Sequence, residues 1–324
     1  MNSTHKAEVV EVNLEKHPDA DSLSVVRIGG YTVVVKTSDW KEKYGVYITP
    51  ESQIDTTRPE FAFLHKGRQF EVIKVRKLRG VYSQGLLVKV PVAEFEVGQD
   101  FAEYFGVVHY TPPEYDETNA GEDSKSPIAV GKYDVDSLRK YRYIITDGEP
   151  VIVLEKAHGQ NIRCIWKDEQ LYVGTRNRWV KEGEFAQCWK VIRSQRDNIE
   201  ALCKAYPGHV LYGEGVGFNP GFEYGYSKAN LGFLAFDLMK PDLTFINAET
   251  ARSIIAGFNI KQVPTFGVMP FNYDKLAEMI EKPSPYFPFN KCMEGVVVKP
   301  LVERQAKCGR VILKLVSNVY LEKS

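Results

Sequence analysis

Short segments in the first 110 residues alternate apolar and polar positions with a period of two, which is typical of half-buried strands. Gly29-Gly30 between two of these segments predicts a hairpin. The predicted strands are Ala7–Val12, Ser24–Ile28, Tyr31–Lys36, Gly45–Ile48, Glu71–Lys77 and Gly85–Val90. So many short strands in about 100 residues predict a small all-β barrel.

The pattern changes in the second half of the chain, where strands alternate with helices. Helices are predicted over Ser194–Ala205, Asn247–Ala256 and Tyr273–Glu281. Asn247 is a candidate N-cap with Gly257 past the helix end, and Pro283 stops the third helix. This mixture predicts an α+β core around a central cleft.

Residues 111–127 form the clearest linker, because prolines, small polar residues and acids against one lysine cannot build a core. We therefore predict three parts. Residues 1–110 form an OB-like barrel that binds nucleic acid, residues 111–127 an acidic linker, and residues 128–324 the mixed core.

Composition narrows the class of protein. A chain of 324 residues with 44% hydrophobic and 12% aromatic residues is typical of a globular protein. It has no apolar run near the roughly 18 residues of a membrane span, no signal-peptide core, and five scattered cysteines without a Cys-x-x-Cys pair. We expect a cytoplasmic monomer with reduced thiols and no membrane partner. Since 42 basic residues balance 42 acidic ones, binding to nucleic acid requires the basic residues to gather on one face.

Lys156 is the strongest candidate for chemistry. The apolar run Val151–Leu154 predicts a buried strand, and Glu155-Lys156-Ala157-His158-Gly159 follows it. A lysine at the mouth of a buried strand can be a desolvated amine nucleophile. The alternative is a surface lysine before a turn. Further along the chain lie motifs that supply partners for such an amine: Gly174–Arg178, Leu211–Gly215, Phe233–Leu238, Met293–Lys299 and Val311–Leu315.

These motifs, in this order, resemble the covalent nucleotidyltransferase superfamily of ATP-dependent ligases and capping enzymes. The version Glu155-Lys156-x-His158-Gly159-x-Asn161 is most similar to RNA ligases that seal nicks. An OB-like module before the core, with little chain after the last motif, resembles the Deinococcus-type RNA ligases. The resemblance implies an ATP-grasp-like ligase core that uses ATP with Mg²⁺ or Mn²⁺, a lysyl-AMP intermediate, and as substrate a nick in duplex RNA or an RNA/DNA hybrid.

The resemblance also implies roles for single residues. Lys156 attacks the α-phosphate, for which its pKa must fall from ~10.4 toward ~7.5, helped by burial and by the charges of Lys299 and Lys314. Glu294 serves the metal, and Gly295 permits a bend that places it before the strand. The nucleotide-binding residues are Glu155 (adenine amino group), His158, Asn161 (phosphate), Arg176 with Arg178 as second choice, Glu214 between two glycines (ribose), Phe236 (adenine stacking), Lys299 and Lys314.

Two departures from the family pattern stand out. His158 occupies a position where many ligases have aspartate. The nick-sealing branch has Lys-x-Lys in the last strand, whereas here Lys314 has Ile312 and Val316 at the alternative positions. Either one phosphate contact is missing, or Lys307 or Arg310 replaces it.

The N-terminal segment contains two further signals. His17-Pro-Asp-Ala-Asp-Ser-Leu23 resembles the tRNA-binding modules appended to aminoacyl-tRNA synthetases, and we expect its residues to fix a turn and to place Leu23 in the barrel core. A basic run supplies candidate nucleic-acid ligands, with Lys74 and Arg76 on one strand face and Phe70 and Tyr82 nearby: Lys74, Arg76, Lys77 and Arg79, preceded by Lys66 and Arg68. The alternative is an edge strand that carries charge against aggregation.

Two rival functions remain. One is a GTP-dependent capping guanylyltransferase, which the His158-Gly159-x-Asn161 signature disfavours. The other is a non-catalytic RNA-binding protein with a decayed core, against which the joint retention of Lys156, Glu214, Glu294, Lys299 and Lys314 argues.

Overall fold

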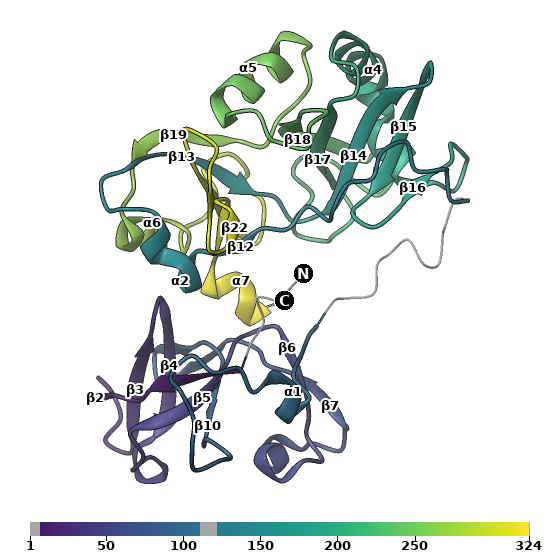
Figure 1. Ribbon diagram of the computed structural model, residues 1–324. Helices are drawn as coiled ribbons and strands as arrows, with labels where there is room; N and C mark the ends of the chain where they lie inside the picture. The colour runs from purple at the N-terminus through teal and green to yellow at the C-terminus, as the bar shows by residue number, and fades with distance from the viewer. Residues whose placement is uncertain (1–6, 111–121, 324) are drawn as a thin grey trace. The chain divides into compact units, whose positions relative to one another are not determined.

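The computed structural model describes residues 7–110 and 122–323 (Figure 1). The chain divides into two compact units, Met1–Pro112 with Leu321–Ser324, and Pro113–Tyr320. Most of the predicted linker, residues 111–121, lies outside the described residues, so its bounds stay a prediction.

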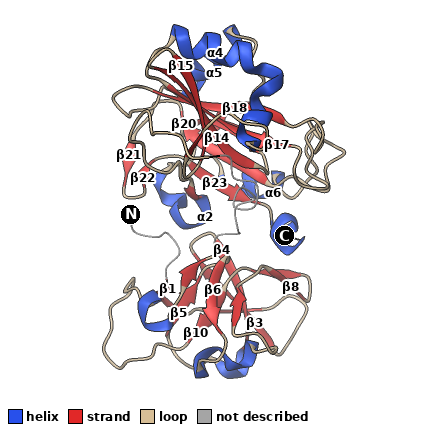
Figure 2. Cartoon of the chain, turned by 90° about the vertical axis from the view of Figure 1, so that its right-hand side faces the viewer, coloured by secondary structure: helices blue, strands red, loops and turns tan. Residues whose placement is uncertain are grey.

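The N-terminal unit is built almost entirely of short strands (Figure 2). They form the sheets β1-β5-β10, β2-β3-β4 and β11-β6-β7 and the separate hairpin β8-β9. The strands are β1 (Ala7–Glu11), β2 (Leu14–Lys16), β3 (Leu23–Ile28), β4 (Tyr31–Lys36), β5 (Tyr44–Ile48), β6 (Ser52–Asp55), β7 (Phe70–Val72), β8 (Arg76–Leu78), β9 (Val81–Ser83), β10 (Leu86–Val88) and β11 (Val108–His109). Short helical turns complete it: η1 (Thr37–Asp39), η2 (Pro59–Leu64) and α1 (Ala102–Phe105).

Alternation along the strands builds this unit's core, as predicted. Val9, Val46 and Ile48 point inward from β1 and β5 and pack with Phe61 and Phe105. The hairpin at Gly29-Gly30 is confirmed, since Ile28 pairs with Tyr31 across it.

The predicted strand Glu71–Lys77 is wrong, because Ile73–Val75 is not a strand. β7 pairs with β6, whereas β8 pairs with β9. Ile73 and Val75 lie in the segment that connects β7 to β8, and their burial anchors this segment. Lys74 is therefore exposed outside any strand and does not share a strand face with Arg76.

The C-terminal unit contains two five-stranded sheets. The first has the order β12-β23-β20-β13-β19 and the second β16-β15-β14-β17-β18. The first sheet comprises β12 (Asp136–Ser137), β13 (Pro150–Lys156), β19 (Thr265–Pro270), β20 (Gly295–Pro300) and β23 (Leu313–Val316). The second comprises β14 (Gln160–Lys167), β15 (Gln170–Thr175), β16 (Trp179–Val180), β17 (Val210–Val216) and β18 (Gly232–Met239), and β21 (Gln305–Ala306) and β22 (Gly309–Arg310) form a separate hairpin.

Helices cover the outer faces of the two sheets (Figure 1). These are α2 (Leu138–Tyr141), η4 (Arg142–Ile144) and α6 (Tyr273–Met279) on the first sheet, and α3 (Gln187–Ile192), η5 (Arg193–Gln195), α4 (Arg196–Ala205) and α5 (Ala248–Gly257) on the second, followed by the last helix α7 (Asn318–Lys323). Between the sheets, Ile152 and Leu154 of β13 pack with Val216 and Leu234 of the second sheet. No helix within the described ranges is long and apolar enough to cross a membrane.

The three predicted helices are present, with different ends. The Asn272 side chain caps α6 by accepting the Lys275 backbone N–H. Asn247 precedes α5 but makes no such bond, because its oxygen accepts the Glu303 N–H at 2.9 Å. Gly257 is the last residue of α5 rather than the residue after it.

Candidate active site

Lys156 is the last residue of β13, and its ammonium Nζ lies 2.7 Å from Glu294 Oε1. Antiparallel pairing with β20 sets Lys156 opposite Gly295, so Glu294 lies immediately before the strand, as predicted. Gly295 is required at this point, since a Cβ there would be 2.1 Å from the Leu315 carbonyl oxygen. The sequence therefore brings a lysine and a carboxylate together at one end of the sheet.

Strand register places three lysines on the face of the first sheet that points toward the second. Leu154 pairs with Val297, and Val297 pairs with Lys314 on the next strand. Since side chains alternate along a strand, Lys156, Lys299 and Lys314 share this face. Lys314 is half-buried and makes no hydrogen bond or ion pair with another described residue.

Lys299 is different, because a carboxylate that the sequence analysis missed holds it. Its side chain is 1% exposed and its Nζ donates to Asp237 Oδ2 at 2.8 Å. Asp237 balances the charge of Lys299, and the predicted help of Lys299 in lowering the pKa of Lys156 stays a prediction. Nucleotide binding by Lys299 likewise stays a prediction.

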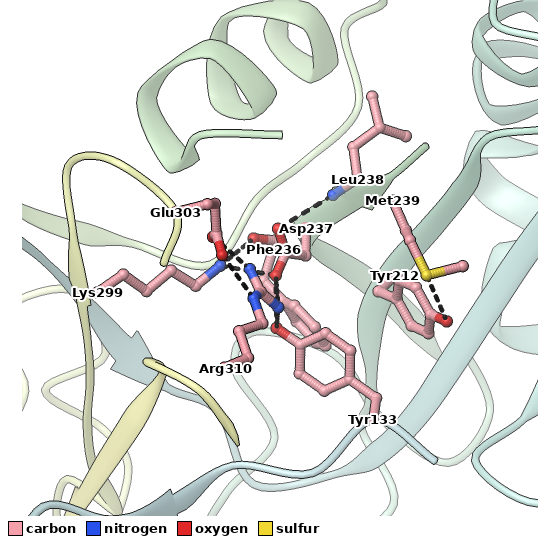
Figure 3. Close-up of polar contacts among 9 residues, drawn as sticks. All are labelled: Tyr133, Tyr212, Phe236, Asp237, Leu238, Met239, Lys299, Glu303 and Arg310. Atoms are coloured by element: carbon pink, nitrogen blue, oxygen red, sulfur yellow. Dashed lines mark hydrogen bonds and ion pairs between the residues drawn. The ribbon is translucent and has the colours of Figure 1, made fainter. Parts of the chain in front are cut away.

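Asp237 is the centre of a buried polar cluster (Figure 3). Arg310 Nη1 lies 2.8 Å from its carboxylate and the Tyr133 hydroxyl donates to it at 2.6 Å. Arg310 also pairs with Glu303 at 2.5 Å. Burial alone raises the pKa of Asp237, but the cations Lys299 and Arg310 outweigh it and hold that pKa below its usual range. Arg310 is thus committed to this cluster and does not replace the missing lysine of the last strand.

Asp237 could have been suspected from the sequence. It is a lone acid within the apolar strand run Phe233–Leu238, and a buried charge requires a partner. Its partners Lys299 and Tyr133, however, lie 62 and 104 residues away in the chain. No local sequence pattern could therefore identify them.

Glu214 on β17 pairs with Asn161 on β14, the neighbouring strand of the second sheet. Burial raises its pKa to about 8, although Lys156 and a hydrogen bond from the Gly159 N–H act in the opposite direction. Its flanking glycines, Gly213 and Gly215, lie against core side chains rather than against open space. A Cβ on Gly213 would be 2.3 Å from the Phe233 ring, and one on Gly215 would be 3.0 Å from Val191, so both glycines serve core packing.

Several buried oxygens of the described residues have no hydrogen-bond partner, and two of them belong to predicted site residues. These two are Asn161 Oδ1 and Glu294 Oε2. An unmade hydrogen bond on a buried oxygen costs roughly 1–3 kcal/mol, and both atoms are of the kind that binds Mg²⁺ or Mn²⁺ directly or through water. The residues present therefore fit a divalent cation.

His158 is enclosed by aromatic side chains that the sequence analysis missed. Its Nδ1 lies 2.8 Å from the Tyr320 hydroxyl, and its backbone N–H donates to the Tyr224 hydroxyl at 2.7 Å. The Phe222 ring packs edge-on at 5.1 Å between ring centroids. Burial lowers the pKa of His158, which favours the neutral imidazole. Glu294 Oε2 lies 4.0 Å from His158 Nδ1, so the imidazole belongs to the same site.

Glu155 leaves β13 on the side opposite to Lys156, because neighbouring residues of a strand point to opposite faces. It is 2% exposed and accepts a hydrogen bond from Ser284 Oγ at 2.8 Å. Burial raises the pKa of Glu155 to about 7. The structure thus places this carboxylate in the protein interior.

Phe236 stands at a β-bulge, since Tyr212 pairs with Asp237 while Gly213 pairs with Ala235. A bulge turns its side chain relative to the regular alternation. The half-buried ring lies 5.2 Å from the Tyr133 ring.

Of the two candidate arginines, Arg176 is hydrogen-bonded to Asp134, and its charge lowers the pKa of Glu214. Arg178 instead pairs with Asp123 at 2.6 Å. Arg176 is therefore the arginine that belongs to the Glu214 site.

The four basic candidates of the N-terminal unit are exposed around the β8–β9 hairpin. Arg76 and Lys77 lie on β8, Arg79 at the tip of the hairpin, and Lys74 in the segment before it.

This fold and this lysine-centred site define the class to which the chain is related. Residues 149–316 match the RNA ligase family, and residues 7–113 match an OB-fold domain. The chain belongs to the RNA ligase family. The predicted order of an OB-fold module followed by a nucleotidyltransferase core is therefore confirmed.

Solved structures share the whole architecture. The chain is 23% identical to the RNA ligase of Naegleria gruberi with pyrophosphate, with a TM-score of 0.80 over 99% of both chains. It is 24% identical to a variant of that ligase with ATP and Mn, with a TM-score of 0.80 over 98% of both. Among curated proteins, Protein Early 65 kDa of Autographa californica nuclear polyhedrosis virus is 22% identical over 177 residues, which make up 52% of this chain and 30% of that protein. The chain thus matches less than a third of that relative.

Proposed function

We propose that this protein is an ATP-dependent ligase that seals 3′-OH/5′-phosphate nicks in duplex RNA through a lysyl-AMP intermediate on Lys156. The observation that carries the proposal is the contact of 2.7 Å between Lys156 Nζ and Glu294 Oε1, beside the unpartnered oxygens of Glu294 and Asn161. Membership of the RNA ligase family and the structures of the Naegleria ligase with ATP and Mn support the choice of nucleotide and metal.

In the first step the neutral amine of Lys156 attacks the α-phosphorus of ATP, a P–N bond forms, and the bond to the leaving pyrophosphate breaks. The ammonium must first lose a proton, and Glu294 Oε1 is an acceptor within hydrogen-bond distance. Mg²⁺ or Mn²⁺, held by Glu294 and Asn161, would offset phosphate charge and compete with the ammonium for Glu294. The ligand set is incomplete with protein atoms alone, as is usual where phosphates and water complete a magnesium shell.

The remaining residues orient the nucleotide. Glu214, largely protonated at neutral pH because of its raised pKa, exchanges hydrogen bonds with the ribose hydroxyls. Phe236 stacks on adenine, and Arg176 and Lys314 contact phosphates. His158 approaches the phosphates as a neutral imidazole fixed by Tyr320. Glu155, which accepts a hydrogen bond from Ser284, stays the predicted partner of the adenine amino group.

In the later steps AMP is transferred from Lys156 to the RNA 5′-phosphate, and attack by the 3′-OH then expels AMP and seals the strand. The basic residues Lys74, Arg76, Lys77 and Arg79 hold the nicked RNA or RNA/DNA hybrid through its phosphates. A monomeric state and a cytoplasmic location stay predictions.

The test is to incubate the protein with a divalent cation and ATP, GTP or NAD separately, and to weigh the intact chain. The proposal expects a mass increase of one AMP with ATP alone. An adduct with GTP but not ATP would favour a capping-type guanylyltransferase. No adduct with any nucleotide, combined with tight RNA binding, would favour a non-catalytic RNA-binding protein.

A further inference from the structure

The tip of the β8–β9 hairpin has a backbone conformation that does not suit its sequence. Leu78 pairs with Val81, so Arg79 and Gly80 form a two-residue turn. Both have positive φ, 47° for Arg79 and 88° for Gly80, as in a type I′ turn. Asn-Gly is the preferred pair for this turn, because L residues with longer side chains seldom adopt the left-handed conformation. An arginine held there is a departure that calls for a functional reason.

Arg79 is also exposed and unneutralised. Neither Arg79 nor Arg76 makes a hydrogen bond or ion pair with another residue of the described chain. Many other surface cations of this unit do have acidic partners, namely Lys16 with Asp21, Arg27 with Glu15, Lys43 with Glu11, and Lys89 with Glu42. Arg76 and Arg79 are therefore among the exposed cations of the N-terminal unit that no acidic side chain neutralises, and Arg79 is the one at the tip of this hairpin.

The hairpin is fixed to the unit at both ends. At its base, Ser83 Oγ accepts the Val34 N–H at 3.0 Å, and Gln84 Oε1 accepts the Thr32 N–H at 2.9 Å. Near its tip, the fully buried His17 bonds the carbonyl oxygen of Leu78 at 3.2 Å.

The partners of His17 determine its tautomer. The Asp19 backbone N–H donates to His17 Nδ1 at 3.1 Å, and an N–H can only donate. Nδ1 must therefore be the acceptor, and Nε2–H donates to the Leu78 carbonyl. The motif His17–Leu23 is thus anchored by its histidine, whereas Leu23 is only half-buried at the start of β3 and not in the barrel core as expected.

We infer that Arg79 is the principal RNA-phosphate contact of the N-terminal unit, and that His17 is a positioning residue that holds Arg79 at the hairpin tip. The guanidinium offers a fork of donors that matches two phosphate oxygens. Because the backbone beneath it is fixed before RNA arrives, little backbone freedom is lost on binding. This inference rests on the proposed function, since it takes the RNA that is to be sealed as the ligand.

The decisive variant is Arg79→Asn, which gives the turn its preferred sequence while removing the guanidinium. Binding to a labelled nicked RNA duplex is measured by fluorescence anisotropy at several salt concentrations, together with sealing by the full chain and its melting temperature. We expect binding and sealing about three- to tenfold weaker, a salt-dependence slope smaller by about 0.7 to 0.9, and a melting temperature equal to or above that of the wild type. Arg79→Lys should restore part of the binding because it keeps the charge. Lys41→Asn, the same loss of charge at an exposed position outside the hairpin, should bind as the wild type does.

An Arg79→Asn variant that binds and seals as well as the wild type would overturn the inference and favour a hairpin that carries charge only to deter edge pairing. The role of His17 is tested by His17→Ala alone and in the Arg79→Asn background. If His17 acts through Arg79, its removal weakens binding in the wild type and adds less than twofold to Arg79→Asn; additive losses would overturn its positioning role. RNA binding does not require the lysyl-AMP, so failure to form the adduct would count against the proposed function and leave this test standing.

Discussion

Among the lysine–carboxylate pairs of the C-terminal unit, the two formed by lysines of the first sheet have nearly the same contact distance and very different surroundings. Lys156 and Glu294 are 2.7 Å apart, with side chains 25% and 7% exposed. Lys299 and Asp237 are 2.8 Å apart, with side chains 1% and 0% exposed. Both lysines lie on the same face of the same sheet, so neither residue type nor strand position separates them.

The difference lies in how completely each carboxylate is satisfied. Asp237 accepts from Lys299, Arg310, Tyr133 and the Leu238 N–H, and no capacity remains for a ligand. Glu294 retains an oxygen without a hydrogen-bond partner at the more open end of the strand. A buried cluster in which every polar group is paired stabilises one arrangement of the fold. A cluster with an unpaired oxygen can still bind a substrate or a metal ion. We therefore assign chemistry to the first pair and support to the second.

The largest expected effect is on the first pair. Glu294→Gln should lower the rate of lysyl-AMP formation by about a thousandfold or more, because a neutral amide replaces the negative charge that favours a cation and cannot take the proton of the Lys156 ammonium. The rate is measured by single-turnover incorporation of labelled AMP, with circular dichroism to confirm the fold. Glu278→Gln, which removes an exposed carboxylate on α6, is the matched control. A Glu294→Gln protein that is labelled at more than a tenth of the wild-type rate would contradict the assignment.

The second pair should show its effect in stability. Asp237→Ala leaves Lys299 buried without a counter-charge and Arg310 with Glu303 alone, and removing one partner of a buried ion pair typically costs about 3–5 kcal/mol. Urea denaturation of the variant measures this, with the exposed Asp147→Ala as control, expected to change stability by less than about 0.5 kcal/mol. If Asp237→Ala unfolds at nearly the wild-type urea concentration but does not form the adduct, then the buried pair, too, takes part in chemistry.

The third prediction concerns pH and the buried Glu155. Its pKa is raised from 4.5 to about 7 by burial, so the folded protein holds a proton that the unfolded chain releases. This contribution to the free energy of unfolding is fully present below pH 4.5 and is lost as the pH rises to about 7 and above. Glu155→Gln removes the titration and should match the wild type near pH 5 but exceed its stability at pH 8 by up to about 3 kcal/mol. Parallel urea curves at the two pH values, with an equal offset, would show that Glu155 does not titrate in this range.

The smallest effect is expected for Tyr320, which contacts His158 next to the Lys156–Glu294 pair. Tyr320→Phe keeps the ring packing but removes the hydroxyl that lies 2.8 Å from His158 Nδ1. Loss of one such bond is worth about 1 kcal/mol, so adenylylation should slow by about fivefold while the melting temperature changes little. An unchanged rate over a series of ATP concentrations would mean that Tyr320 does not orient His158.

The sequence analysis found the residues that local motifs mark. Lys156 ends a strand, and His158, Glu214 and Glu294 stand beside glycines. The helices were predicted separately, from residues such as Asn247, Gly257 and Pro283 at their ends. The prediction that Glu294 precedes the strand is confirmed, and the structure shows why Gly295 is needed there, since a Cβ would be 2.1 Å from the Leu315 carbonyl oxygen.

What the sequence did not reveal depends on contacts between distant segments. Asp237 meets Lys299 across two sheets, and Tyr320 reaches His158 from the last helix, 162 residues further along the chain. Gly213 and Gly215 are packing positions, and a sequence pattern does not reveal this because it does not show which face of a strand is covered. The prediction of one strand over Glu71–Lys77 was wrong because Ile73 and Val75 are buried in a connection between two strands, β7 and β8, that pair with different neighbours.

The measurement that tests the central claim most directly is to locate the nucleotide on the protein. The full chain is incubated with ATP and Mg²⁺, digested, and the AMP-bearing peptide sequenced by mass spectrometry, with Lys156→Arg and Lys299→Arg treated in parallel. The account predicts AMP on Lys156 in the wild type, none in Lys156→Arg, and adduct still on Lys156 in whatever fraction of Lys299→Arg remains folded. AMP on Lys299, or an adduct that persists in Lys156→Arg, would contradict it.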